Sequence, residues 1–139
     1  MSSRKMFVNL PVADLQRSID FFTSLGFAFN PQFTGEKAAC VIVNENAFAM
    51  LLTEPFFKSF TTRQICDTKT HCEALFAFSC ESRADVDQIV HKAVAAGGKH
   101  AADPADHGFM YDWSFFDPDG HEWGVFWMDP SHVQPTGAH

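Results

Sequence analysis

The same order of segments occurs twice in this chain of 139 residues. Residues 7–22 align without a gap on residues 75–90, and each copy begins with an extended apolar stretch that leads into a helical pattern. Self-similarity over such a length indicates two related structural units that pack together. The repeat therefore favours a pair of similar modules. The alternative is that a chain with alternating strands and helices shows this likeness by chance.

The first copy has the pattern of a strand, a helix and three further strands. Asp14 is a residue that accepts a backbone N–H at a helix N-terminus, and Gly26 is typical of a helix end. Between them, apolar residues recur at helical spacing on one face. We expect strands at 6–12, 27–33, 38–43 and 47–52, with a helix at 15–25.

The second copy repeats the pattern. Ser82 can cap a helix with an apolar stripe from Val86 to Val94, and Gly97 and Gly98 end it. Proline and glycine in the turn Asp117–Gly120 predict a hairpin near the C-terminus. We expect strands at 73–80, 101–105, 110–116 and 122–128. The fold class is therefore α+β, with two βαβββ repeats.

A chain of this length forms one domain with its own core. Within it we expect a first module at 6–52, a connector at 53–72, a second module at 73–128 and a frayed tail at 129–139. The connector contains Phe56, Phe57 and Phe60. Exposed phenylalanines are unfavourable, so these side chains are predicted to form a lid over a cavity or to meet a partner subunit.

Charge and composition exclude some partners. A formal net charge of -7 argues against nucleic acids and anionic membranes, which bind clustered Lys and Arg. No apolar run reaches the ~20 residues of a membrane span. The cysteines form no CxxC pair, and we expect them to be reduced thiols of a cytoplasmic protein. They are Cys40, Cys66, Cys72 and Cys80.

Two motifs give the chain a family resemblance. The first is LPVADLQRSIDFFTSLGF, from Leu10 to Phe27, and the second is DPDGHEW, from Asp117 to Trp123. Together with the repeat, they resemble the vicinal oxygen chelate superfamily of glyoxalase I, bleomycin-resistance proteins, extradiol dioxygenases and methylmalonyl-CoA epimerase. The resemblance implies that the strands curl into a half-barrel with helices on the outer face. It does not imply one reaction.

The resemblance also implies where metal ligands would lie, on the first and last strand of each copy. Those positions hold Phe7, Met50, Leu75 and Gly124, and none offers an imidazole, carboxylate or thiolate donor. We therefore predict no metal and no other cofactor. A displaced site for Zn, Ni or Fe would have to use Glu122 with His121, His107 or His71, which we place near one rim.

Without a metal, the half-barrel becomes a pocket for a small hydrophobic or aromatic molecule. Strand alternation puts Phe7 and Asn9 on one face, and Val8, Leu10 and Val12 on the opposite face toward helices. The predicted lining is Phe7, Asn9, Met50, Leu75, Ala77 and Gly124, with Tyr111 and Trp113 stacking on a planar ligand. Alternatively, these residues fill a closed core. Candidate acid–base groups are Glu122, His107 and Tyr111.

Three functions remain open. The first is metal-independent binding of a small molecule, for which the acidic balance favours a cationic aromatic compound. The second is a lyase or isomerase of glyoxalase type, similar to lactoylglutathione lyase, with a displaced metal or with acid–base catalysis alone. The third is a non-catalytic homodimer with the connector at its interface. Lys58 and Arg63 are the only nearby cations for an acidic substrate.

Overall fold

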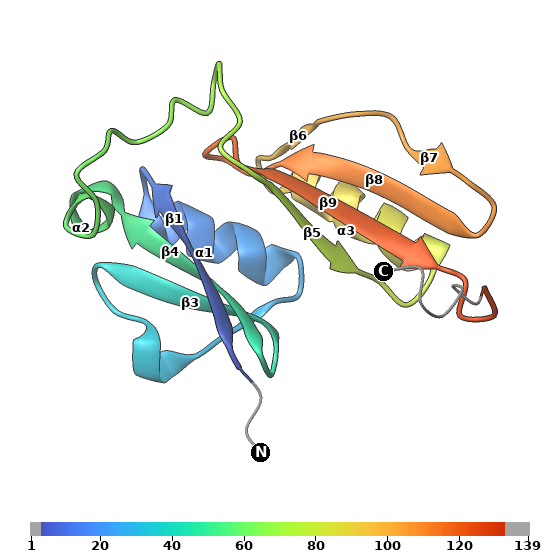
Figure 1. Ribbon diagram of the computed structural model, residues 1–139, viewed down its shortest axis with the longest axis horizontal. Helices are drawn as coiled ribbons and strands as arrows, with labels where there is room; N and C mark the ends of the chain where they lie inside the picture. The colour runs from blue at the N-terminus through green and yellow to red at the C-terminus, as the bar shows by residue number, and fades with distance from the viewer. Residues whose placement is uncertain (1–3, 133–139) are drawn as a thin grey trace.

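Two modules lie side by side in the computed structural model, which describes residues 4–132. Figure 1 shows a sheet in each module and the connector passing from one module to the other. The elements, in chain order, are β1 (Met6–Val12), α1 (Leu15–Ser24), β2 (Ala28–Phe29), the 3-10 helix η1 (Pro31–Phe33), β3 (Ala38–Asn44), β4 (Ala47–Thr53), α2 (Glu54–Lys58), β5 (Leu75–Ser79), α3 (Arg83–Ala95), β6 (Lys99–His100), β7 (Ala105–Asp106), β8 (Met110–Phe116) and β9 (Glu122–Met128).

The two sheets have the same topology. The first has the order β1-β4-β3-β2 and the second β5-β9-β8-β6, with β7 paired to β8. In each sheet the first strand is parallel to the last strand of its module, as β1 is to β4 and β5 is to β9, and the other pairs are antiparallel. The predicted repeat and α+β class are confirmed. The sheets are mixed and do not close into a barrel.

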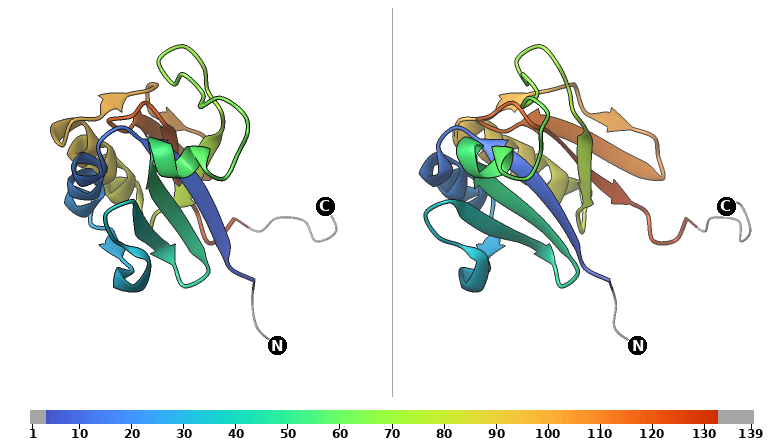
Figure 2. Two further views of the ribbon diagram at one scale, coloured as in Figure 1. Left: turned by 90° about the vertical axis from the view of Figure 1, so that its left-hand side faces the viewer. Right: turned by 60° about the vertical axis from the view of Figure 1, so that its left-hand side comes forward.

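Helices α1 and α3 cover the same side of the two sheets (Figure 2). The core lies between these helices and the sheets, and it includes Leu10, Phe22, Val90, Phe115 and Trp123. The central aromatic rings meet edge to face, with ring centroids 5.3 Å apart for Phe22 and Trp123. Such pairs add to the energy gained from burying the rings. A single helix-side core therefore joins the modules.

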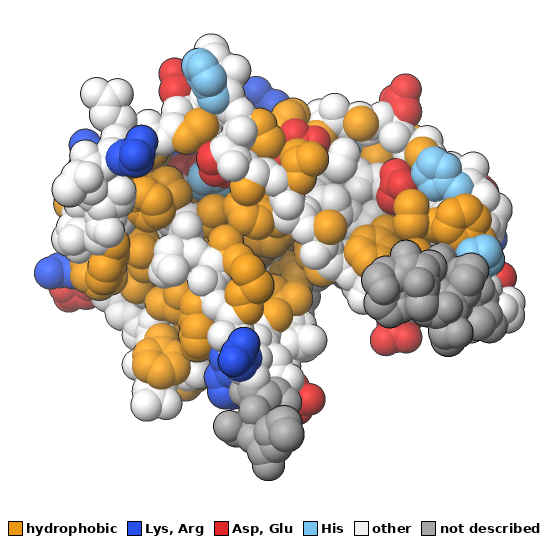
Figure 3. Space-filling model, in the orientation of Figure 1, with side chains coloured by type: hydrophobic (Ala, Val, Ile, Leu, Met, Phe, Trp, Pro, Cys, Tyr) orange, Lys and Arg blue, Asp and Glu red, His pale blue; other side chains and the backbone are white. Residues whose placement is uncertain are grey.

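Neither α1 nor α3 covers the opposite side of the sheets. Large apolar side chains remain accessible there, including Phe7 at 41% and Leu75 at 73% of their full exposure. Figure 3 shows hydrophobic side chains over the face of the first sheet and an indentation between the modules. We call this side the open face. It corresponds to the inner side of the expected half-barrel.

Several predicted boundaries are confirmed, and some are wrong. β1, β8 and β9 have the predicted bounds, and Asp14 caps α1 by accepting a hydrogen bond from the Arg17 N–H. The predicted strand at 27–33 ends at Phe29, because Asn30 caps η1 and Pro31 provides no N–H for a ladder. The strand expected at 101–105 is replaced by β6 and β7, which flank Pro104.

The connector contains a helix that the sequence did not indicate. α2 begins at Glu54 with Pro55 in its first turn, a position where the missing proline N–H costs nothing. It packs against β1 and β4. Of the predicted tail at 129–139, residues 133–139 lie outside the described part. None of the helices within residues 4–132 has the length and apolar character that crossing a membrane requires.

Candidate functional site

The four positions implied for metal ligands all lie on the open face. Their sequence neighbours Val8, Leu51 and Phe76 pack in or against the helix-side core, so alternation directs Phe7, Met50 and Leu75 the other way. The register places Met50 opposite Asn9 and Gly124 opposite Ala77. The predicted alternation along the strands is confirmed.

These side chains do not fit a divalent metal ion. Phe7, Met50, Leu75 and Gly124 provide two hydrocarbon side chains, a thioether and a hydrogen, where zinc, nickel or iron needs nitrogen, oxygen or thiolate donors. No group of three or more His, Cys, Asp or Glu within residues 4–132 is arranged to hold a metal ion.

Two aromatic residues predicted for the pocket lie elsewhere. Tyr111 and Trp113 share a strand face with the fully buried Phe115, so they point to the helices and not to the open face. The Tyr111 hydroxyl donates to Asp87 Oδ1 on α3 at 2.6 Å, and the Trp113 indole N–H donates to the Ala102 carbonyl at 2.7 Å. Their assignment to the pocket is wrong.

The three candidate acid–base residues do not meet. Glu122 lies on the open face opposite Phe116, at one end of β8. His107 lies by the other end, where its Nε2 is 3.1 Å from Asp112 Oδ2. Tyr111 points to the helix side, and its hydrogen bond to Asp87 raises the pKa of its hydroxyl to about 12. These residues do not form one catalytic site.

A cavity of about 240 Å³ lies between the end of β1, the connector and the turn before β9. We call it the connector cavity. Of the predicted pocket residues, Asn9 lines it; of the predicted lid residues, Phe57 does. The complete lining is Asn9, Leu10, Pro11, Phe57, Thr61, Arg63, Gln64, Cys66, Glu73 and His121. The cavity therefore combines residues from both modules and from the segment that joins them.

His121 is the most constrained polar residue of this lining. Its side chain is 2% exposed, and its Nδ1 is 2.8 Å from Glu73 Oε1. Its Nε2 is 2.8 Å from the Pro11 carbonyl at the end of β1. Both ring nitrogens face acceptors, which favours a ring that donates from both and carries a positive charge. His121 thus connects the end of β1 in the first module with the start of the second module.

The surroundings of His121 act on its pKa in opposite directions. Burial alone lowers the pKa, while the Asp117 carboxylate, the Pro11 carbonyl and the Glu73 carboxylate raise it, and together they outweigh burial. The pKa of His121 is therefore above its ordinary value. In the same cavity, burial and then the Glu73 carboxylate raise the pKa of the Cys66 thiol, which leaves it protonated near neutral pH.

The hairpin motif around His121 joins the two modules by hydrogen bonds and an ion pair. The Asp119 carboxylate accepts hydrogen bonds from the Ala13 N–H at 2.8 Å and from the Ser18 hydroxyl at 3.1 Å, and it pairs with Arg17. Asp117 is 4% exposed and accepts from the Trp123 indole N–H at 3.0 Å. The sequence indicated a turn here, but not these contacts. The sequence feature that could have indicated these contacts is the presence of two acidic residues and a histidine in one short turn.

The remaining lid residues cluster beside the cavity. Phe56 and Phe60 meet edge to face with centroids 5.0 Å apart, and Phe60 is 69% exposed. Lys37 lies over the Phe56 ring. Phe57 is thus the member of the predicted lid that contacts the cavity, while Phe60 presents its ring to the surface.

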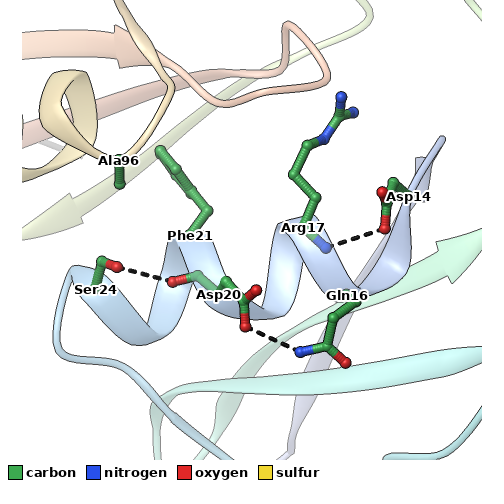
Figure 4. Close-up of a pocket in the computed structure, with 7 residues that line it drawn as sticks. All are labelled: Asp14, Gln16, Arg17, Asp20, Phe21, Ser24 and Ala96. Atoms are coloured by element: carbon green, nitrogen blue, oxygen red, sulfur yellow. Dashed lines mark hydrogen bonds between the residues drawn. The ribbon is translucent and has the colours of Figure 1, made fainter.

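A larger hollow lies on the outer side of α1. It measures about 440 Å³ and is bordered by polar side chains of that helix and by Ala96 (Figure 4). Its side chains bond to one another, as Gln16 does to Asp20 at 2.9 Å. The polar side chains of α1 that line it are exposed, and the hollow lies on the side away from the open face. We assign no function to it.

One known protein family matches most of the chain. The family model of the Glyoxalase/Bleomycin resistance protein/Dioxygenase superfamily matches residues 6–125. The chain belongs to this superfamily. The match spans the first module, the connector and the second module as far as the middle of β9, so the superfamily fold accounts for the paired βαβββ arrangement. No curated protein sequence matches the chain.

Solved structures have a similar fold. Protein SA1046 of S. aureus is 26% identical and superposes with a TM-score of 0.74, covering 91% of this chain and 94% of its own. A glyoxalase-related enzyme from Fulvimarina pelagi is 19% identical, with a TM-score of 0.77 and coverages of 99% and 94%. The fosfomycin resistance protein FosX from Listeria monocytogenes is 16% identical, with a TM-score of 0.64 and coverages of 97% and 96%.

Proposed function

We propose that this superfamily member binds a small molecule with a hydrophobic or aromatic body in the connector cavity, without a metal ion. The observation that carries the proposal is the cavity itself, with Leu10, Pro11 and Phe57 as apolar lining beside a few polar groups. Apolar walls with a few convergent polar groups are typical of ligand sites. A volume of about 240 Å³ suits a small compound.

Two further observations support this function. The positions of the usual metal ligands carry no donors, so a metal-dependent reaction has no inherited site. In addition, FosX from Listeria monocytogenes is a structurally similar protein that is named for resistance to fosfomycin, a small molecule. Binding of a small molecule to this chain would require only the connector cavity and the residues that line it, without a metal ion.

The test combines metal analysis with ligand binding. Purified protein is analysed for bound zinc, nickel and iron, and its melting temperature is then measured with a set of small planar aromatic compounds. We expect less than stoichiometric metal and a rise in melting temperature with some compounds. Thr61→Trp, which places a large ring in the cavity lining, should abolish the rise. Stoichiometric metal that is required for binding would contradict the proposal.

An acid–base enzyme is the second candidate, and Glu73 favours it. This carboxylate lines the cavity and its side chain is 26% exposed, while His121 holds one of its oxygens. A positioned carboxylate can take a proton next to a carbonyl, as an isomerase of glyoxalase type requires. Turnover of the methylglyoxal–glutathione adduct that Glu73→Gln abolishes would favour the enzyme. Turnover only with added nickel or zinc would indicate a displaced metal site.

We also propose a homodimer of a cytoplasmic protein. The exposed rings and aliphatic side chains of Phe7, Phe60 and Leu75 are apolar area that a second copy could cover. Closed two-fold dimers are the commonest assembly, and the four cysteines are free thiols, as expected in a reducing compartment. Light scattering after size-exclusion chromatography should give about twice the chain mass of 15.5 kDa.

A further inference from the structure

Besides the Cys66 thiol, three ionisable side chains line the connector cavity, and two of them are opposite in charge. The Glu73 carboxylate and the His121 ring are 2.8 Å apart and form an ion pair when the ring is protonated. The acceptors on both ring nitrogens favour that protonated form. This pair therefore contributes little net charge to the cavity.

The acidic residues of the neighbouring turn do not line the cavity. Asp119 is neutralised by Arg17 at 3.1 Å. Asp117 is 4% exposed and is held by the Trp123 indole and the backbone N–H groups of Asp119 and His121. Both carboxylates already accept hydrogen bonds from the protein, so neither is directed to a ligand in the cavity.

Arg63 is the third charge, and it forms no ion pair with the residues that the structure describes. The four ion pairs found within residues 4–132 do not include Arg63. The backbone N–H of Arg63 donates to Thr61 Oγ1 at 3.1 Å, which holds the connector in a turn beside the cavity. The lining therefore contains an exposed arginine that has no acidic partner among the described residues, although the whole chain carries -7.

We propose that the connector cavity is selective for a small organic carboxylate. The carboxylate would pair with the Arg63 guanidinium, and the body of the ligand would contact Leu10, Pro11 and Phe57. A planar guanidinium matches a carboxylate with two parallel hydrogen bonds. This inference rests on the proposed function and names its ligand class. It reverses the cationic ligand expected from net charge, because contacts within the cavity outweigh distant surface charges that salt screens.

The test compares phenylacetate with phenylacetamide, which has nearly the same shape and no charge. Isothermal titration of the wild-type protein should give about tenfold tighter binding of phenylacetate, equivalent to about 1.4 kcal/mol. Arg63→Gln should remove this preference. Lys69→Gln is the matched control, because Lys69 is an exposed cation of the same connector that is absent from the cavity lining. This variant should keep the preference.

Other results would overturn the inference in distinguishable ways. Equal affinity for both probes, or a preference for phenethylamine, would refute selectivity for a carboxylate and leave the binding cavity in place. An equal loss in Arg63→Gln and Lys69→Gln would show that long-range charge, and not Arg63, attracts the anion. No binding of any of the three probes would contradict both this inference and the proposed function.

Discussion

At the scale of single residues, the His121 ring contacts two distant parts of the chain. Its ring nitrogens contact Pro11 and Glu73, residues that lie 110 and 48 positions away in the chain. Pro11 is half-buried, so loss of the ring leaves its carbonyl without a donor, while the Glu73 side chain is 26% exposed. The energetic cost of such a loss exceeds the modest value of the hydrogen bonds themselves.

His121→Ala should therefore reduce the free energy of unfolding by about 2–4 kcal/mol. The change removes a buried ring and leaves the Pro11 carbonyl and Glu73 unpaired. Urea unfolding followed by circular dichroism measures it. His71→Ala is the control, since His71 is exposed in the connector, and it should stay within about 0.5 kcal/mol of wild type. Equal effects of the two changes would refute the connecting role of His121.

The stability that His121 contributes should depend on pH. Its pKa is higher in the folded chain than the ordinary value of about 6.5, so protonation favours the folded state. The contribution is complete below about pH 6.5 and is lost as the pH rises through the raised folded value. The difference in the free energy of unfolding between wild type and His121→Gln should therefore shrink as the pH rises through the folded pKa of His121. A difference that grows with pH would contradict the charge assignment.

Gly124 allows a direct test of the mapped metal positions. A Cβ at this glycine would meet its nearest atom, the Phe76 carbonyl oxygen, at 3.6 Å, which is an ordinary contact. Gly124→Glu should therefore fold. Because the other three positions still lack donors, zinc affinity measured with a competing chelator should remain weak. Nanomolar affinity in this variant would show that the positions are mapped wrongly.

Residue-level properties were predictable where they depend on strand alternation alone. The direction of Phe7 and Asn9 toward the open face followed from the period of two along β1. The same rule, applied backward from the buried Phe115, would have directed Tyr111 and Trp113 to the helices. The burial of His121 was not predictable, because it depends on a carbonyl of the other module.

At the scale of elements, the strands with clear turn signals were predictable. Pro118 and Gly120 gave the hairpin before β9, and Gly120 has the positive φ of 83° that this turn requires. α2 was missed because a helix of five residues is stabilised by packing against β1 and β4 and not by a periodic stripe. The connector cavity was missed with it.

The end of α3 provides a test at the same scale. A Cβ at Gly98 would lie 2.5 Å from the Phe116 carbonyl oxygen and 2.9 Å from the Ala93 carbonyl oxygen, and backbone atoms cannot easily move. Gly98→Ala should therefore lower the free energy of unfolding by about 1–3 kcal/mol. Gly35→Ala is the matched control, because no atom lies within 4 Å of its added methyl group. Chemical unfolding of both variants should show a loss only for Gly98→Ala.

At the scale of the whole molecule, the repeat predicted two modules but not how polar contacts join them. The core on the helix side is shared, and the motif around Asp117, Asp119 and His121 adds contacts from the second module to β1 and α1. Because the connector cavity lies at this junction, ligand binding and the stability of the junction should be linked.

A chemical-shift map tests whether the metal-free protein binds a small aromatic compound in the connector cavity. Isotope-labelled protein is treated with a chelator and titrated with the compound that most raises the melting temperature. We expect the largest amide shifts at Asn9, Phe57, Thr61, Gln64 and Cys66, around the connector cavity. Shifts that appear only after zinc or nickel is added, or that gather on the outer side of α1, would contradict metal-free binding in the connector cavity.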